Sequence, residues 1–355
     1  MTKKISVFFI IFFTFSFLIY LQSVKVIKDP KPTHFEKKFV RLKMIKKVGY
    51  DFDDENFIGK VGSVTADREG NLYIYDSLQT KIFKLNKNLK LVKGFGSKGR
   101  GPGEFGSRVF SVVLNVGSDN KLYAADNFNK KIHMFDLNGK LIADYPIKYK
   151  RRFLPVVTIS GDFIIPSSSD DNSLNLYSKD LNIKKVLIKR KSFDKFLFYK
   201  PGYLIIEIVR RPDYETNLFY RLSDDNKLIV IIGNDMTYFL FKDFKLIRKR
   251  KILPALILDD FKKYATKNLV NTDDTYGPLI SRCFFDSDDS NFFYLQFFRD
   301  EKKGWDILYK FSTKGDLIKV LYIKANEKNV YSRFLLKRNN IFYVNDINYM
   351  YLFKE

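Results

Sequence analysis

The chain repeats a pattern of residues after an interval of fifty positions. Residues 70–91 carry a Tyr and an Asp three positions apart, a Lys-Ile pair, two Asn residues and a Lys-Leu pair, and residues 120–141 carry the same or similar residues at the matching positions. A third copy of the Tyr-to-Asp element lies at Tyr343 to Asp346. Self-similarity with a period of roughly 40–50 residues is typical of stacked repeats and of propeller blades. The repeat therefore restricts the fold to an architecture that uses one small unit several times.

Short runs of alternating polarity, separated by turns rich in Asp, Asn and Gly, indicate strands rather than helices. The first unit contains four such runs, at residues 61–66, 72–75, 81–85 and 90–95. Further units lie at residues 110–147, 156–190 and 283–323, whereas residues 196–252 hold more strands than one unit and fewer than two. Four-stranded antiparallel blades of this kind build a β-propeller. We predict an all-β fold with six blades, and seven blades as the alternative.

The last unit, residues 334–353, is one strand short. Residues 39–48 precede the first complete unit and have no other partner, so we expect them to supply the missing strand. That pairing would close the ring and leave no exposed strand edge at the junction. The propeller domain is accordingly predicted to span residues 39–355.

The N-terminus has the layout of an export signal. Lys3 and Lys4 precede an uncharged, Phe-rich stretch at residues 5–24, which is long enough to cross a membrane as a helix. Because no Ala-x-Ala cleavage site is present, a signal-anchor is favoured over a cleaved signal peptide. We expect residues 1–24 to anchor an extracytoplasmic domain in the cytoplasmic membrane, with residues 25–38 as a linker. A secreted or periplasmic protein after cleavage is the alternative.

Composition excludes some classes of protein. The 355 residues include 36 Phe and 22 Tyr and are 45% hydrophobic, so disorder is not expected. A single cysteine, Cys283, rules out an intrachain disulfide and is expected to be a small buried hydrophobe.

The net charge of +23 is spread through many turns rather than gathered in one patch, which favours a solvated basic surface over a nucleic-acid groove. We expect a monomer without a nucleic-acid partner.

Two segments resemble NHL-type repeats. Residues 94–105 look like the glycine-rich connector between blades of that family, with glycines at Gly96, Gly99, Gly101 and Gly103, and residues 122–135 resemble its strand–Asp–strand core. Together these segments are similar to exported bacterial six-bladed β-propellers. The glycines suit a tight crossing from one blade to the next. They do not suit a nucleotide site, because neither a helix N-terminus nor a Lys-Ser/Thr pair follows them.

The recurring aspartates have a structural interpretation. Asp76, Asp126 and Asp346 share one repeat position, so we expect them to cap the loop between the second and third strands by accepting backbone N–H bonds. The alternative is a ring of carboxylates that holds Ca²⁺, to which Asp235 and the cluster at Asp286, Asp288 and Asp289 could also contribute. No cofactor or metal is otherwise expected.

The longest irregular segments are predicted on one face of the propeller. They are blade connectors and loops between second and third strands, at residues 96–108, 167–173, 210–216, 253–278 and 299–305. A rigid scaffold with elaborated loops on one side is the usual arrangement for recognition. We therefore predict binding on this upper face, with Arg100, Arg108, Tyr276 and Trp305 as candidate contact residues, and a short helix at residues 259–269 packed over the rim.

The residue inventory favours a binding protein over an enzyme. Only His34 and His133 are present, in the linker and in a predicted third strand, so a multi-histidine metal centre and a Ser-His-Asp triad are not expected. We predict a binding or protein-interaction scaffold whose partner is a protein or a small ligand. The alternative is a propeller hydrolase or lactonase with an oxygen-ligated metal in the central channel.

Overall fold

The computed structural model describes most of the predicted propeller. The described residues are 24–26, 39–49, 57–106, 112–148, 153–167, 173–189, 195–200, 203–209, 218–223, 225–232, 237–251, 282–285, 291–300, 305–324, 334–338, 341–345 and 349–354.

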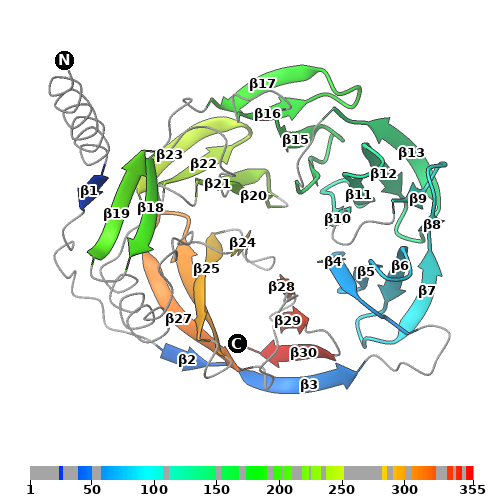
Figure 1. Cartoon of the computed structure of the whole chain (residues 1–355), viewed down its shortest axis with the longest axis horizontal. Helices are drawn as coiled ribbons and strands as arrows, with labels where there is room; N and C mark the ends of the chain where they lie inside the picture. The colour runs from blue at the N-terminus through cyan, green and yellow to red at the C-terminus, as the bar shows by residue number, and fades with distance from the viewer. Residues whose placement is uncertain are drawn as a thin grey trace, which may run out of the picture.

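Six sheets stand around a common axis as the blades of a propeller (Figure 1). Blade 1 consists of β4 (Val61–Ala66), β5 (Leu72–Asp76), β6 (Lys81–Leu85) and β7 (Leu91–Phe95). Blade 2 consists of β10 (Val112–Val116), β11 (Leu122–Asp126), β12 (Lys131–Phe135) and β13 (Leu141–Pro146). Blade 3 consists of β14 (Val156–Val157), β15 (Phe163–Pro166), β16 (Leu174–Tyr177) and β17 (Ile183–Ile188).

The other three blades complete the ring. Blade 4 consists of β20 (Leu218–Leu222), β21 (Lys227–Ile232), β22 (Thr237–Lys242) and β23 (Lys245–Lys251). Blade 5 contains β24 (Arg282–Phe285), β25 (Phe292–Asp300), β26 (Trp305–Ser312) and β27 (Leu317–Lys324). Blade 6 contains β28 (Phe334–Arg338), β29 (Ile341–Asn345) and β30 (Tyr349–Lys354). The prediction of an all-β, six-bladed propeller is confirmed.

The strand count between residues 196 and 252 is explained by a hairpin that belongs to no blade. The strands β18 (Lys195–Lys200) and β19 (Tyr203–Val209) pair with each other, and β1 (Val24–Val26) pairs with β19 in the same three-stranded sheet (Figure 1). The surplus strands therefore do not make a seventh blade. The predicted helix at residues 259–269 and all but the last residue of the predicted membrane segment lie outside the described residues. Among the described residues, no helix has the length and hydropathy needed to span a bilayer.

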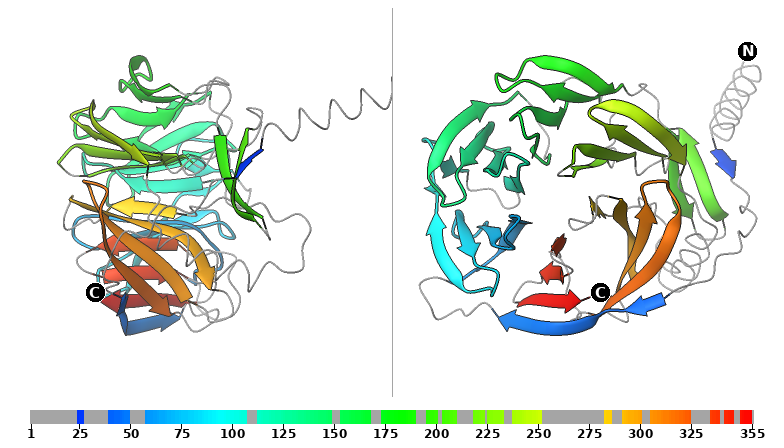
Figure 2. Two further views of the ribbon diagram at one scale, coloured as in Figure 1. Left: turned by 90° about the vertical axis from the view of Figure 1, so that its left-hand side faces the viewer. Right: turned by 180° about the vertical axis from the view of Figure 1, so that it is seen from behind.

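The N-terminal segment closes the ring, with one difference from the prediction. The strand β3 (Lys43–Gly49) pairs antiparallel with β30 as the fourth strand of blade 6, and the two lie side by side in Figure 2. The residues just before it do not continue that strand. Instead β2 (Phe39–Arg41) pairs parallel with β27 as a fifth strand of blade 5. The predicted single strand is thus two short strands on neighbouring blades, because the chain crosses from one blade edge to the next at Leu42.

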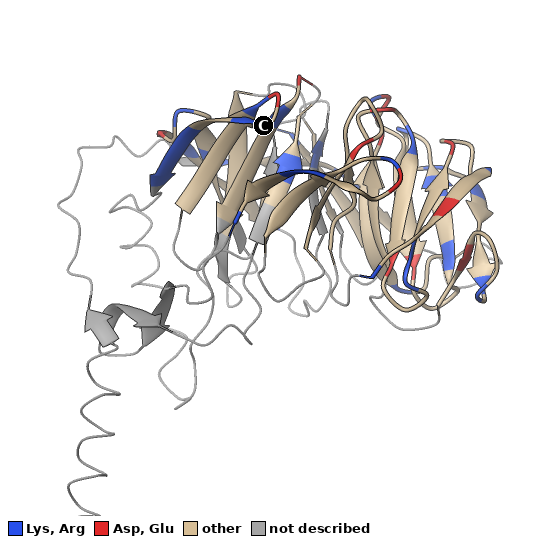
Figure 3. Ribbon diagram, turned by 90° about the horizontal axis from the view of Figure 1, so that it is seen from above, with Lys and Arg blue, Asp and Glu red and all other residues tan. Residues whose placement is uncertain are grey.

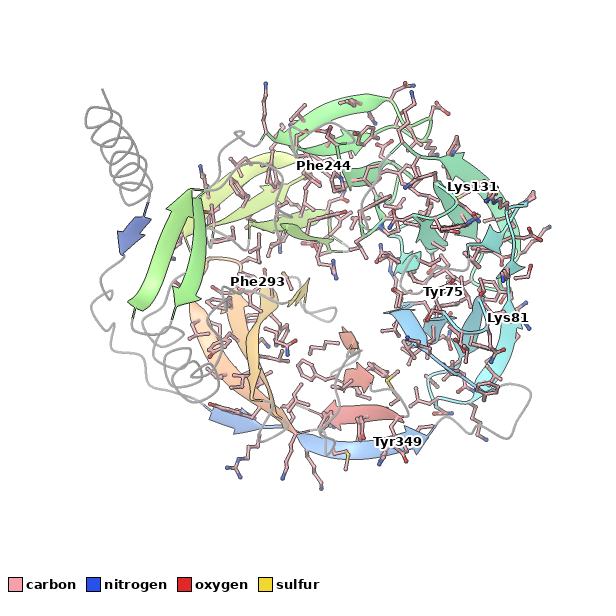
Figure 4. All side chains as sticks on the ribbon, in the orientation of Figure 1. Tyr75, Lys81, Lys131, Phe244, Phe293 and Tyr349 are labelled. Atoms are coloured by element: carbon pink, nitrogen blue, oxygen red, sulfur yellow. The ribbon has the colours of Figure 1, made fainter. Side chains whose placement is uncertain are left out.

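The core lies between adjacent blades. The second strands β5 and β11 are buried along their whole length, because each blade packs against a neighbour on both faces. One buried cluster joins Tyr75 and Ile82 of blade 1 with Leu114 and Phe135 of blade 2, and Tyr75 is marked in Figure 4. Outermost strands such as β7 are largely exposed.

Candidate functional site

Asp76 ties a blade connector to the loop between β5 and β6. Its buried carboxylate accepts backbone N–H bonds from Gly59 at 2.6 Å and Lys60 at 3.1 Å, both in the segment that leads into β4. It also accepts backbone bonds from Leu78 at 2.7 Å and Gln79 at 3.3 Å. A carboxylate that accepts several N–H bonds fixes both segments relative to each other. The face that carries these connectors and loops is called the upper face below.

Asp126 makes the equivalent contacts one blade later. Its carboxylate accepts backbone bonds from Gly106 in the connector at 2.7 Å, and from Phe128 and Asn129 in the loop at 2.8 and 3.1 Å. These are the bonds expected of a capping aspartate. The described residues hold no group of three or more side chains suited to a metal ion. Asp235, Asp286, Asp288, Asp289 and Asp346 lie outside the described residues.

The glycine-rich connector is a braced loop. Gly96 and Gly103 adopt φ values of +77° and +70°, and residues with a side chain rarely adopt this conformation. Each of these glycines precedes a short strand, and the two strands, β8 (Ser97–Lys98) and β9 (Glu104–Phe105), pair parallel with each other. The Glu104 carboxylate accepts the Gly101 N–H at 2.7 Å, and it lies so close to Gly99 that a Cβ there would collide with it.

The connector also binds the loop of blade 2. The Asn129 side-chain amide donates to the carbonyls of Gly99 at 2.8 Å and Glu104 at 3.1 Å. The Lys131 ammonium donates to the Arg100 carbonyl at 3.0 Å, with Lys131 marked in Figure 4. The backbone at Arg100 is therefore held while the residue itself stays exposed.

Two apolar side chains project from the capped loops. Leu78 is 65% exposed and Phe128 is 38% exposed, and each follows a capping aspartate by two residues. Each also lies against the glycine before its own blade, because a Cβ at Gly59 would be 2.6 Å from Leu78 and a Cβ at Gly106 would collide with Phe128. Sequence reasoning missed this pair. The pattern that could have indicated Leu78 and Phe128 is an apolar residue two positions after each of the recurring aspartates.

Asn127 lies between a cap and an exposed ring. Both polar atoms of its side chain are buried, and neither has a hydrogen-bond partner within the described part of the chain. The matching residue of blade 1, Ser77, donates its hydroxyl to the Lys60 carbonyl at 3.1 Å. The amide of Asn127 thus keeps an open donor and an open acceptor, which is uncommon for buried polar atoms.

The four predicted contact residues are not brought together as a set. Arg100 is exposed at the connector, as described above. Arg108 and Tyr276 lie outside the described residues. Trp305 begins β26 and pairs in register with Asp300 and Lys324, and nothing is described of its side chain. The role of these residues in binding stays a prediction.

His133 forms a pair that the sequence analysis did not predict. It lies in β12 directly opposite Asp144 of β13, and its Nδ1 is 2.7 Å from the Asp144 carboxylate. The ring is fully buried against Phe105, with ring centroids 5.0 Å apart, and its Nε2 has no partner among the described residues. A fully buried imidazole is suited to packing rather than to proton transfer with a substrate.

Cys283 is buried in β24. Burial raises the pKa of its thiol to about 12, so the nucleophilic thiolate is absent at neutral pH. Figure 3 shows basic and acidic residues interspersed over the described blades rather than one continuous basic face.

The blade topology defines the class of this protein as a six-bladed β-propeller. Residues 34–161 match the family model DUF5128, described as a 6-bladed beta-propeller. The matched segment covers β2 to β14, which includes both capping aspartates and the glycine-rich connector.

A solved structure with a TM-score above 0.5 supports the fold, and two others are reported with it. A putative exported protein from Bacteroides fragilis aligns with a TM-score of 0.57 and 12% identity over 89% of this chain and 98% of that one. A member of the DUF4221 family from Bacteroides vulgatus gives a TM-score of 0.49 and 11% identity, covering 88% and 97% of the two chains. Virginiamycin B lyase from Staphylococcus aureus gives 0.48 and 11% identity, covering 88% and 99%. No curated protein matches the chain.

Proposed function

We propose that this chain is a binding or protein-interaction scaffold that captures its partner on the upper face of blades 1 and 2. The observation that carries the proposal is the exposure of Leu78 and Phe128 at equivalent positions on loops fixed by capping aspartates. Apolar side chains held in place on a rigid loop lose little conformational entropy when they are covered by a partner. The pair is therefore suited to serve as the apolar centre of an interface.

Polar groups beside this pair would orient the partner. Arg100 is exposed on the braced connector, whereas the amide of Asn127 is buried and out of a partner's reach. Interfaces commonly combine apolar anchors with arginine and a few directional hydrogen bonds. The partner surface is accordingly apolar at its centre with an acidic group near Arg100.

The scaffold is proposed to act outside the cytoplasm. The apolar segment at residues 5–24, preceded by Lys3 and Lys4, supports an N-terminal membrane anchor. An anchor of this kind would hold the propeller at the membrane surface while its loops remain accessible to a partner in the cell envelope.

Site-specific crosslinking tests the proposal on the full-length protein in its native envelope. A photoreactive side chain at position 128 is expected to capture a defined partner on irradiation. The same group at Val92, which is 52% exposed on the outer strand β7, should not capture it. Leu78→Asp and Arg100→Ala should each reduce the adduct formed through position 128, with stability changed by no more than about 0.5 kcal/mol, as is usual at exposed sites.

The control for surface effects is Val92→Asp, which should leave the adduct unchanged. Equal capture from positions 128 and 92, or an adduct unaffected by both Leu78→Asp and Arg100→Ala, would show that the upper face of blades 1 and 2 is not the binding surface.

A further inference from the structure

The outer edges of the blades carry charge of almost one sign. The fourth strands of the six blades contain thirteen Lys or Arg residues and a single acidic residue, Asp144. The basic residues are divided unevenly, with one in β7, two in β17, five in β23, two in β27 and three in β3. Twelve of the thirteen therefore belong to blades 3–6. Like charges gathered on one side of a protein attract anions to that side.

The strand β23 of blade 4 is the most basic of the six. Five of its seven residues are basic, namely Lys245, Arg248, Lys249, Arg250 and Lys251. Every residue from 245 to 250 is exposed, because β23 is the last strand of its four-stranded sheet. Within the described chain, Asp316 is the one carboxylate that forms an ion pair with this strand, at 3.4 Å from the Arg250 guanidinium. Most of the positive charge of β23 is therefore not neutralised by the described part of the protein.

Two apolar side chains interrupt this basic run. Leu246 and Ile247 are 53% and 58% exposed. Apolar side chains gain free energy when they enter the boundary between lipid headgroups and acyl chains, and basic residues are attracted to anionic headgroups. A soluble polyanion would satisfy the basic residues alone. The combination in β23 therefore fits the surface of an anionic bilayer better than it fits a soluble polyanion.

The N-terminal strand β1 lies on the same side of the ring as β23. It pairs with β19 outside the ring, and Figures 1 and 2 both show their sheet at the side of blades 4 and 5. The predicted membrane segment, residues 5–24, ends at the first residue of β1. A bilayer that holds this segment would thus begin close to the basic edge. A short tether of this kind gives two surfaces a high effective concentration.

We propose that the outer edge of blade 4, centred on β23, binds the surface of an anionic phospholipid bilayer. The proposal rests on the membrane anchor of the proposed function and adds an orientation to it. Blades 4 and 5 face the bilayer, whereas blades 1 and 2, on the other side of the ring in Figure 1, keep their upper face available to a partner. The anchored propeller is then fixed by two contacts rather than suspended from one.

Fluorescence from a single labelled position tests the contact. Full-length Ile247→Cys is labelled with an environment-sensitive fluorophore and reconstituted into vesicles of phosphatidylcholine with or without anionic phosphatidylglycerol. The buried thiol of Cys283, with its raised pKa, should not react with the label. We expect the emission at position 247 to shift to the blue, and to be quenched by headgroup-labelled lipid, in the anionic vesicles alone. The matched control is Val92→Cys on β7, which is 52% exposed and should report water in both vesicles.

Charge removal assigns the contact to β23. Lys245→Gln combined with Lys249→Gln should lower the ratio of bound to unbound propeller about 25-fold, since each basic residue near an anionic surface contributes about fivefold. Lys90→Gln combined with Lys93→Gln removes the same charge from exposed positions of blade 1 and should leave the signal unchanged. Sodium chloride at about 0.5 M should release the contact, because it shortens the screening length.

The proposal is overturned if the fluorophore at position 247 reports water in anionic vesicles, or reports the same contact in phosphatidylcholine alone. It is also overturned if the two double lysine variants respond equally, since net charge rather than β23 would then be responsible. Extraction with alkaline carbonate separates this failure from failure of the anchor. Protein that resists extraction while position 247 stays in water retains the anchor and lacks the contact. Protein that is extracted lacks the anchor, and the tethered contact fails with it.

Discussion

At the residue scale, basic side chains connect neighbouring blades. Lys46 donates to the Asn88 carbonyl at 3.0 Å, Lys84 to Leu137 at 2.9 Å and Lys185 to Phe244 at 2.8 Å, with Phe244 marked in Figure 4. Arg248 and Arg250 both donate to the Lys314 carbonyl, at 3.4 and 3.2 Å. Each acceptor lies in the turn between the third and fourth strands of the following blade. Part of the net positive charge therefore serves blade-to-blade contact as well as solvation.

These contacts could not be predicted from the sequence, because they depend on how one blade is placed against the next. The same limit applies to His133 and Asp144, whose pairing requires the register of two strands. The hydrogen bonds of Asp76 and Asp126 were predictable, since their recurrence at one repeat position indicates a role that each blade needs. The exposure of the Leu78 and Phe128 side chains was not predicted, because a local sequence pattern does not show which side chains lie at the surface.

Removal of a capping carboxylate should weaken the fold. Asp76→Ala leaves four part-buried backbone N–H groups without their acceptor and is expected to lower the free energy of unfolding by about 2–4 kcal/mol. Asp316→Ala removes an exposed ion pair with Arg250 and should cost about 1 kcal/mol or less. Chemical denaturation of both variants measures the difference. Equal losses would contradict the assignment of Asp76 as a structural cap.

At the scale of elements, the crossing between β2 and β3 fastens two blades together. Leu42 is buried in a cluster that contains Leu308 and Leu321 of blade 5 and Phe353 of blade 6, and its N–H donates to the Tyr322 carbonyl at 3.0 Å. The sequence predicted a closing strand here because the last blade was incomplete. It could not show the division into two strands, since both halves have the composition of an outer strand.

Leu42→Ala should therefore destabilise the closure of the ring. Loss of a buried leucine side chain is expected to lower the free energy of unfolding by about 2–4 kcal/mol. Ile45→Ala is the matched control, because Ile45 lies three residues on and is 47% exposed. Its cost should be about 0.5 kcal/mol or less, as for most exposed positions. Denaturant midpoints of the two variants provide the comparison, and a small loss at Leu42 would show that the crossing is dispensable.

At the scale of the whole molecule, the net charge of +23 sets the response to salt. Self-repulsion of like charges destabilises a compact state, and added salt screens it. Tm should rise as sodium chloride is increased from about 0.05 M to about 0.5 M, because that increase shortens the screening length severalfold. A Tm that falls instead would mean that attractive ion pairs outweigh the repulsion. Scanning calorimetry of the full-length protein distinguishes the two results.

The pairing of β3 with β30 also determines when the fold can be completed. Ribosomes make β3 before any blade and β30 after every other strand of the ring, so the two halves of this junction are separated by nearly the whole period of synthesis. Until β30 emerges, β3 lacks its ladder partner and remains available to wrong pairings. Truncation near the C-terminus would consequently leave the N-terminal strand β3 unpaired as well. The demand for chaperones should be greatest for chains that stop just short of blade 6.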